Sequence, residues 1–150
     1  TLSVSFTDEL TLLLPPDLPH RQRLITLASR HLDLIVETNL TMNLTRILSP
    51  RDAAIKHILD SVLPWSLFTP AATIADCGSG AGFPGIPLAI LLPDTQFVLL
   101  ESIQKKARFL ATAIAQLELP NVQVLPLRAE DWLKANTPTF ITARAMAPLE

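Results

Sequence analysis

The chain has 150 residues, of which 49% are hydrophobic and 17% are charged. This length suits one domain with a single core, and the composition excludes both a disordered chain and a small disulfide-stapled module. The net charge of −2 lacks the strongly basic signature of a protein that binds nucleic acid through its whole surface, so such binding would need a local patch.

The first part of the chain is expected to be helical. Helices are predicted at residues 6–14, 18–39 and 50–63, with a loop at residues 41–48. The third helix has the clearest start, because Ser49 is a good cap, Pro50 suits the first helical position and Asp52 stands three residues after the cap.

After Pro70, strand-like segments alternate with helical ones. Strands are predicted at residues 71–77, 96–101, 121–127 and 139–144, and helices at residues 84–92, 102–117 and 130–135. This alternation predicts right-handed crossovers and a parallel sheet. We therefore expect a single α/β domain, with an N-terminal helical extension over residues 1–70 and an α/β core over residues 71–150.

All four glycines fall between Gly78 and Gly85, directly after a predicted strand and before a predicted helix. Glycines there let the main chain turn sharply and let a ligand approach without meeting a β-carbon. A tight turn alone needs only one or two of them. This window is therefore the first candidate for a binding site.

Two acidic residues flank the window and indicate the kind of ligand. Glu101, at the end of the next strand, can accept hydrogen bonds from the ribose hydroxyls of an adenosine-containing cofactor. Asp76 precedes the first glycine by two residues; it would face a pyrophosphate poorly, but it can serve the amino-acid end of S-adenosylmethionine, directly or by orienting the loop. Because Gly80, Gly82 and Gly85 also satisfy G-x-G-x-x-G, an NAD-dependent oxidoreductase remains an alternative.

Several segments of the chain resemble the glucose-inhibited division protein B family. They are Asn43-Leu44-Thr45, Lys56-His57-Ile58-Leu59-Asp60-Ser61, the run from Asp76 through Gly78-Ser79-Gly80-Ala81-Gly82-Phe83-Pro84-Gly85 to Ile90, Leu99-Leu100-Glu101-Ser102, Lys105 to Leu110, Arg128-Ala129-Glu130 and Ala143-Arg144-Ala145. The resemblance implies a Rossmann-like class I fold and a bacterial methyltransferase. Members use S-adenosylmethionine to form 7-methylguanosine in small-subunit (16S) ribosomal RNA.

The resemblance also implies site residues. The family's cofactor contacts fall on Gly78, Phe83, Ala129, Glu130 and Arg144, and the residue pattern itself adds Asp76, Gly80 and Glu101. Glu101 stands where many members have aspartate, and Ala143 replaces a serine often found before the arginine; neither change removes a required group.

Nitrogen 7 of guanine carries a lone pair and no proton, so methylation there needs no general base and we name no catalytic acid or base. Arg144 is the candidate for orienting the base or the cofactor, because a guanidinium can hydrogen-bond the acceptor edge of guanine or stack on its ring.

Candidate RNA contacts are Arg46, Lys56, His57, Lys105 and Lys106. The basic residues either form a solvated face or supply the positive patch that a phosphate backbone requires, and His57 is either structural or in contact with ligand. The expected partner is small-subunit ribosomal RNA or the assembled subunit. A non-catalytic RNA-binding or assembly factor is a further alternative.

Other features bound the remaining possibilities. Cys77 is the single cysteine, so we expect neither an internal disulfide nor a metal site. No apolar run reaches the length of a membrane span, and we expect a cytoplasmic monomer. Class I methyltransferases continue past the fourth strand with three more strands, so we expect the chain to be a fragment whose fourth strand is an exposed apolar edge.

Overall fold

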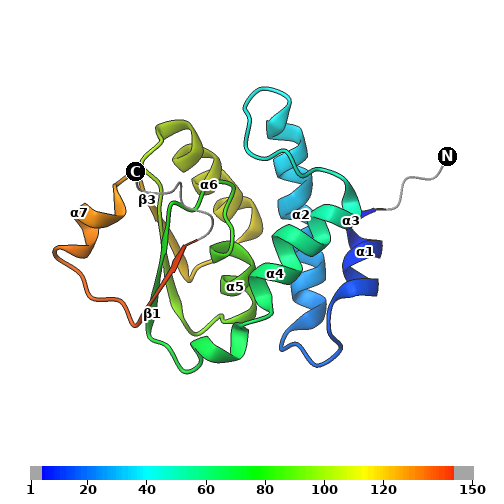
Figure 1. Cartoon of the computed structure of the whole chain (residues 1–150), viewed down its shortest axis with the longest axis horizontal. Coiled ribbons are helices and arrows are strands. Elements are labelled where there is room, and N and C mark those ends of the chain that lie inside the picture. Colours follow the sequence, from blue (N-terminus) through cyan, green and yellow to red (C-terminus); the bar gives the residue numbers. More distant parts are fainter. Residues whose placement is uncertain (1–4, 144–150) are drawn as a thin grey trace, which may run out of the picture.

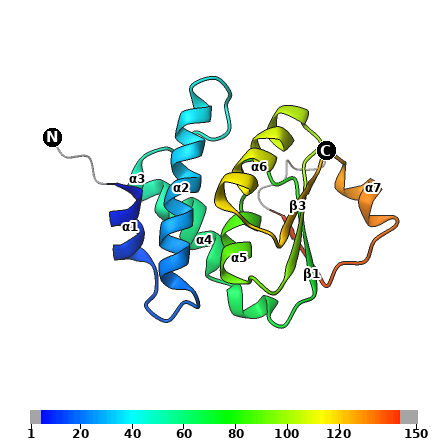
Figure 2. The ribbon, with the colours of Figure 1, turned by 180° about the vertical axis from the view of Figure 1, so that it is seen from behind.

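The computed structural model describes residues 5–143. It places a four-stranded sheet between one helix, α7, and a group of helices that includes α5 and α6, with the N-terminal helices α1 and α2 stacked outside that group (Figure 1). The view from behind shows the same succession of layers (Figure 2). The α/β architecture predicted from the sequence is confirmed.

The N-terminal part is helical up to Phe68. Its elements are α1 (Phe6–Leu13), α2 (Arg21–Asn39), α3 (Pro50–Ala53), the π-helical turn η1 (Ala54–Leu59), α4 (Asp60–Val62) and the 3₁₀ turn η2 (Trp65–Phe68). The first helix begins at a true cap, since the Ser5 side chain accepts a hydrogen bond from the Asp8 amide. The second begins three residues later than predicted, because His20 adopts a left-handed conformation with φ of 51°.

The predicted uniform helix over residues 50–63 is wrong in its middle. The Asp60 amide donates to the carbonyl of Ile55, five residues back, so the chain makes a π turn there. The expected serine cap is also absent: the Ser49 hydroxyl donates to the Asp52 carboxylate at 3.0 Å instead of accepting from the helix. The π turn determines where His57 lies, as described below.

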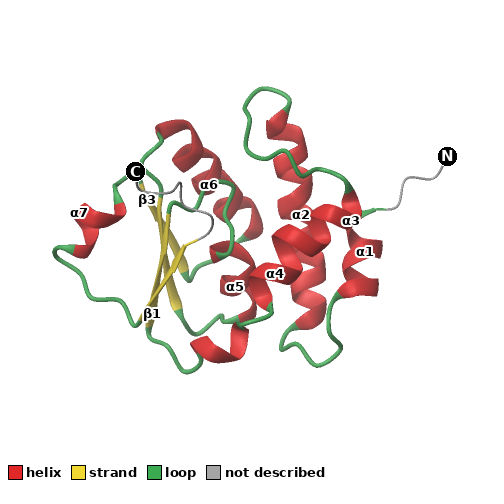
Figure 3. Ribbon diagram, viewed as in Figure 1, coloured by secondary structure: helices red, strands yellow, loops and turns green. Residues whose placement is uncertain are grey.

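The sheet is parallel, with strand order β3-β2-β1-β4. Its strands are β1 (Thr73–Cys77), β2 (Gln96–Leu100), β3 (Val122–Leu125) and β4 (Phe140–Ala143), and the helices between them are α5 (Gly85–Leu91), α6 (Gln104–Leu117) and α7 (Ala129–Leu133). Figure 3 shows the strands as one layer, with helices on both faces. Each strand lies within its predicted range, and each runs with its carboxyl end toward the same edge of the sheet.

The larger hydrophobic cluster joins the N-terminal helices to the core. It runs from Leu10 of α1 through Leu24 of α2 and Ile58 of η1 to Ile86 of α5 and Leu110 of α6. A smaller cluster covers the other face of the sheet, where side chains of β1 and β2 pack beneath α7. The N-terminal helices therefore share one core with the sheet.

The strand β4 lies at an edge of the sheet and pairs only with β1 among the described residues. Phe140 is 38% exposed and Ile141 is 55% exposed. Within residues 5–143, this edge therefore presents apolar side chains beside unpaired main-chain groups, as expected from the sequence.

Candidate functional site at the glycine loop

The glycine loop, residues 78–85, joins the carboxyl end of β1 to α5. Gly78, Gly80 and Gly82 have φ angles of 67°, 59° and 107°, conformations that residues with a β-carbon rarely adopt. The Gly78 amide donates to the carbonyl of Leu100 on the neighbouring strand at 2.9 Å. The start of the loop is therefore tied to the end of β2.

Asp76 is buried beneath the loop and braces it. Its Oδ2 accepts from the Ser79 hydroxyl at 2.9 Å and from the Gly85 amide at 3.1 Å, while Oδ1 accepts from the Thr142 hydroxyl of β4 at 2.9 Å. A β-carbon on Gly85 would lie 2.6 Å from Asp76 Oδ2. Asp76 therefore holds the loop in place, and its role toward a ligand stays a prediction.

Glu101 braces the loop from the other side. Its Oε1 accepts from the Gly80 amide and its Oε2 accepts from the Ile103 amide, both at 2.9 Å. Each carboxylate oxygen retains a second lone pair. The two acids at the ends of β1 and β2 therefore hold one loop.

A hollow of about 160 Å³ opens beside the loop, and we call it the carboxyl-end hollow. It is lined by Cys77, Gly78, Leu100, Ser102, Leu127, Arg128, Ala129 and Glu130. Gly78 is exposed, and a β-carbon built on it would meet no atom within 4 Å, so the main chain there faces open space. The hollow thus combines an accessible glycine backbone with residues that follow three neighbouring strands.

Three of the predicted cofactor residues, Gly78, Ala129 and Glu130, line this hollow. Gly80 and Glu101 lie next to it through the hydrogen bond between them. Phe83 does not line it: its ring is buried against the N-terminal helices. Arg144 lies outside the described residues.

The Phe83 ring contacts two histidines from the N-terminal helices. His57 of η1 stacks on it with ring centroids 4.4 Å apart and an interplanar angle of 2°, and His31 of α2 lies at 4.8 Å with an angle of 33°. His57 Nε2 is 3.1 Å from Thr45 Oγ1 and 3.2 Å from the Ile47 carbonyl. Because it is buried, the ring of His57 does not reach the surface expected of an RNA contact.

His31 is fully buried, and its Nε2 lies 2.8 Å from the carbonyl oxygen of Ala81 in the loop. Burial lowers the pKa of His31 from 6.5 to about 4; the hydrogen bond to Ala81 opposes this shift, and the charge of His57 adds to it. His31 is therefore neutral near pH 7. Sequence reasoning missed this residue, since a single histidine within an apolar helix face gives no local signal.

The basic residues among the predicted RNA contacts lie on three segments. Arg46 is exposed in the loop that follows α2, Lys56 is exposed in η1, and Lys105 is exposed and Lys106 half-buried in the first turn of α6. In Figure 1, the loop of residues 40–49 and the start of α6 both lie at the upper end of the molecule. The structure brings the segments that carry Arg46, Lys105 and Lys106 to the same end.

Cys77 is a buried residue at the end of β1. Burial raises the pKa of its thiol, and the charges of Asp76 and Glu130 raise it further. The thiol is therefore protonated near pH 7 and poorly nucleophilic. Among residues 5–143, no cluster of acidic, histidine or cysteine side chains could hold a metal ion, and none of the described helices has the length and apolarity to cross a bilayer.

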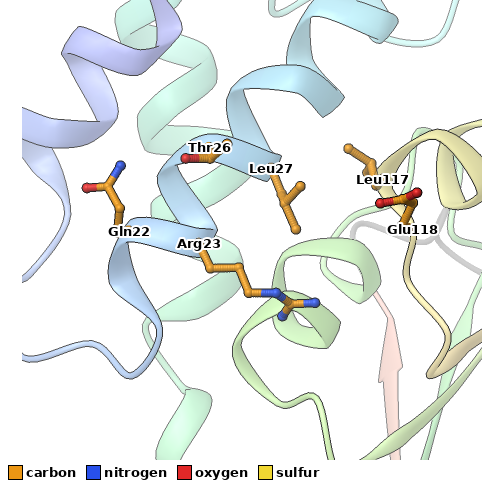
Figure 4. Close-up of a pocket in the computed structure, with 6 residues that line it drawn as sticks. All are labelled: Gln22, Arg23, Thr26, Leu27, Leu117 and Glu118. Carbon is orange, nitrogen blue, oxygen red and sulfur yellow. The ribbon is translucent and has the colours of Figure 1, made fainter.

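A different hollow, of about 370 Å³, lies between α2 and α6 (Figure 4). Arg23 and Leu27 of α2 face Leu117, the last residue of α6, and Glu118, which follows it, across this hollow. The Arg23 guanidinium donates to the carbonyl of Ile90 at the end of α5, so this arginine ties helices together. None of its lining residues belongs to the glycine loop.

Comparisons with known proteins identify the family. The family model described as "rRNA small subunit methyltransferase G" (GidB) matches residues 24–150. Proteins named ribosomal RNA small subunit methyltransferase G are similar to the chain: that of Solibacter usitatus is 64% identical over 97% of the chain, and that of Dichelobacter nodosus is 43% identical over 87%. A third, from Xylella fastidiosa, is 46% identical over 79% of the chain.

The chain spans 70% of the Solibacter usitatus protein, 62% of the Dichelobacter nodosus protein and 56% of the Xylella fastidiosa protein. The matched part includes the glycine loop and both acids that brace it, since the family model covers residues 24–150. Together with the parallel sheet, this match means that the chain belongs to the GidB family, the rRNA small subunit methyltransferase G proteins.

Proposed function

We propose that the chain binds S-adenosylmethionine and forms part of a methyltransferase that makes 7-methylguanosine in 16S ribosomal RNA. The observation that carries the proposal is the glycine loop held by two carboxylates, Asp76 at the end of β1 and Glu101 after β2, beside the carboxyl-end hollow. In open α/β sheets, ligands bind outside the carboxyl ends of the strands. Family membership favours methyl transfer over the NAD-dependent alternative.

The residues present fit this cofactor. The hollow of about 160 Å³ is smaller than the pockets of about 300–1,000 Å³ that usually hold whole small molecules. It would therefore take the adenine end, between Ser102 and Ala129, while the methionine end would lie across the open backbone of Gly78. Glu101 would use its remaining lone pairs for the ribose hydroxyls. Phe83 would contribute through its main chain, because its ring faces the histidines.

The cofactor supplies a methyl group on a positively charged sulfur. Attack of guanine nitrogen 7 on that methyl group would need no proton transfer, because this nitrogen carries a lone pair and no proton. The work of the chain would therefore be to align the reacting atoms and exclude water. The rigid loop suits this role, and Arg144 is our candidate for orienting the base.

The RNA would approach at the carboxyl end of the sheet. Arg46, Lys105 and Lys106 belong to the two segments at this end, and their cationic side chains would pair with phosphates. Lys56, exposed on η1, would add to them. We propose small-subunit ribosomal RNA or the assembled subunit as the substrate, and a cytoplasmic monomer as the acting form. Gel filtration of the chain with and without the subunit tests the last point.

Calorimetry of the chain with S-adenosylmethionine, and separately with NAD, tests the cofactor. Binding of the first alone is expected; binding of NAD alone would overturn the proposal. Transfer of a labelled methyl group to small subunits lacking the modification, followed by nucleoside analysis, tests the reaction. Gly78→Val should abolish transfer and retain RNA binding, whereas an RNA-binding factor without activity would show no transfer even in the unaltered chain.

A further inference from the structure

A buried hydrogen bond outside the carboxyl-end hollow joins the N-terminal helices to the glycine loop. α2 lies on the side of the sheet that carries α5 and α6, and α7 lies on the other (Figures 1 and 2). His31 reaches from α2 to the carbonyl of Ala81 at 2.8 Å. Ala81 directly follows Gly80, whose amide is held by Glu101 at the end of β2. The centre of the loop is thus held by residues of two different elements.

The chemistry of this contact fixes the tautomer of His31. A carbonyl oxygen only accepts hydrogen bonds, so the proton of the neutral ring is on Nε2 and a lone pair remains on Nδ1. Within the described structure, Nδ1 of His31 is buried and has no hydrogen-bond partner. A leucine at position 31 would fill this space without burying an unpaired polar atom. The hydrogen bond to Ala81 is therefore what the imidazole contributes at this position.

The loop also lies too close to His31 to move toward it. A β-carbon on Gly82 would be 3.2 Å from His31 Nε2 and 2.6 Å from Ile86 Cδ1. On the next residue, the Phe83 ring contacts His31 at a centroid distance of 4.8 Å. His31 therefore contacts Ala81 and Phe83 of the loop and leaves no room for a β-carbon on Gly82 between them, and the contact with Ala81 is directional.

We propose that His31 is a positioning residue for the methyl donor: it fixes the main chain of the loop so that the open backbone at Gly78 and the amide of Gly80 keep the geometry a ligand needs. The proposal rests on the proposed function of the loop. It assigns a cofactor-related role to α2, a helix that contributes no residue to the carboxyl-end hollow.

The test compares His31→Leu, which removes the donor, with His31→Gln, whose amide nitrogen can occupy the place of Nε2. Leu24→Ala is the matched control, because Leu24 is a fully buried residue of the same helix two turns away from His31. Urea unfolding establishes the stability of each variant, and binding is measured at a temperature where all are folded.

S-adenosylmethionine affinity, measured by calorimetry, should fall by about tenfold in His31→Leu, the factor equivalent to one ordinary hydrogen bond, and by clearly less in His31→Gln. Leu24→Ala should lose stability and keep the affinity. Equal affinity in His31→Leu and the unaltered chain, or an equal loss in the control, would overturn the proposal.

Amide hydrogen exchange of residues 79–86 without ligand gives an independent readout. Exchange there should accelerate in His31→Leu and stay unchanged in Leu24→Ala once global stability is matched with urea. If the unaltered chain does not bind S-adenosylmethionine, the proposed function fails, and this measurement still decides whether His31 holds the loop.

Discussion

The buried histidine on α2 makes the stability of the protein depend on pH. In the folded chain, burial lowers the pKa of His31 to about 4, whereas the unfolded chain titrates at the ordinary value of 6.5. Between these values the unfolded state binds a proton that the folded state does not. The free energy of unfolding should therefore fall as the pH decreases from 6.5 toward 4, and the full contribution is present above pH 6.5.

The magnitude follows from the separation of the two pKa values. Each unit of separation corresponds to about 1.4 kcal/mol, so the whole shift amounts to about 3.5 kcal/mol. At pH 4.5, just above the folded pKa, about 2.5 kcal/mol of this is lost relative to pH 8. That is a large part of the about 5–15 kcal/mol that stabilises an ordinary domain.

Urea denaturation followed by circular dichroism, from pH 8 to pH 4.5, provides the measurement. Carboxylates also titrate at the acidic end, so the quantity of interest is the difference between the unaltered chain and His31→Leu, in which these groups are shared. His57, the titratable group whose charge acts on His31, is present in both. Relative to His31→Leu, the free energy of unfolding of the unaltered chain should fall by about 2.5 kcal/mol between pH 8 and pH 4.5. Parallel curves would refute the reasoning.

Other substitutions test the loop and the sheet edge. Asp76→Ala leaves three donors without their acceptor, so it should reduce the free energy of unfolding, measured with urea, by about 2–4 kcal/mol. Asp76→Asn should reduce it by clearly less, and equal losses in the two variants would contradict the bracing role. Gly85→Ala should lower the free energy of unfolding by about 3 kcal/mol, because its β-carbon would overlap the Leu99 side chain. Gly78→Ala should lower it by about 1–2 kcal/mol and should weaken S-adenosylmethionine binding, measured by calorimetry. Ile141→Lys should reduce aggregation at the β4 edge, seen as lower light scattering during refolding, and should change the free energy of unfolding by less than about 0.5 kcal/mol. If Leu12→Lys, on α1, reduced the scattering equally, the β4 edge would not be the cause of the aggregation.

The secondary structure could be predicted well where the signals are local. Each predicted strand contains an observed one, and the glycine window was placed correctly between a strand and a helix. The helix over residues 50–63 was predicted less well, because the Ser61 hydroxyl donates to the His57 carbonyl and a π turn replaces the regular helix there. The stacking of His57 on Phe83, which accompanies this turn, has no signature in local sequence.

The candidate site could be predicted in its main-chain part and less well in its side chains. Asp76 and Glu101 were expected at the carboxyl ends of neighbouring strands, and the structure brings both to the loop. Their partners were not expected: Thr142 comes from a strand 66 residues away in sequence. Spacing along the chain indicates which residues follow a strand, but only the packed sheet determines which of them meet.

The sequence by itself determined the fold class and the position of the glycine loop, because strand periodicity and glycine placement are local properties of the chain. The family followed from the resemblance that its motifs carry. Tertiary structure alone decided that Phe83 turns toward the N-terminal helices, that Glu101 holds the loop by its Gly80 amide, and that His31 is neutral. These properties depend on burial and on contacts between distant segments, which exist only once the N-terminal helices and the sheet share one core.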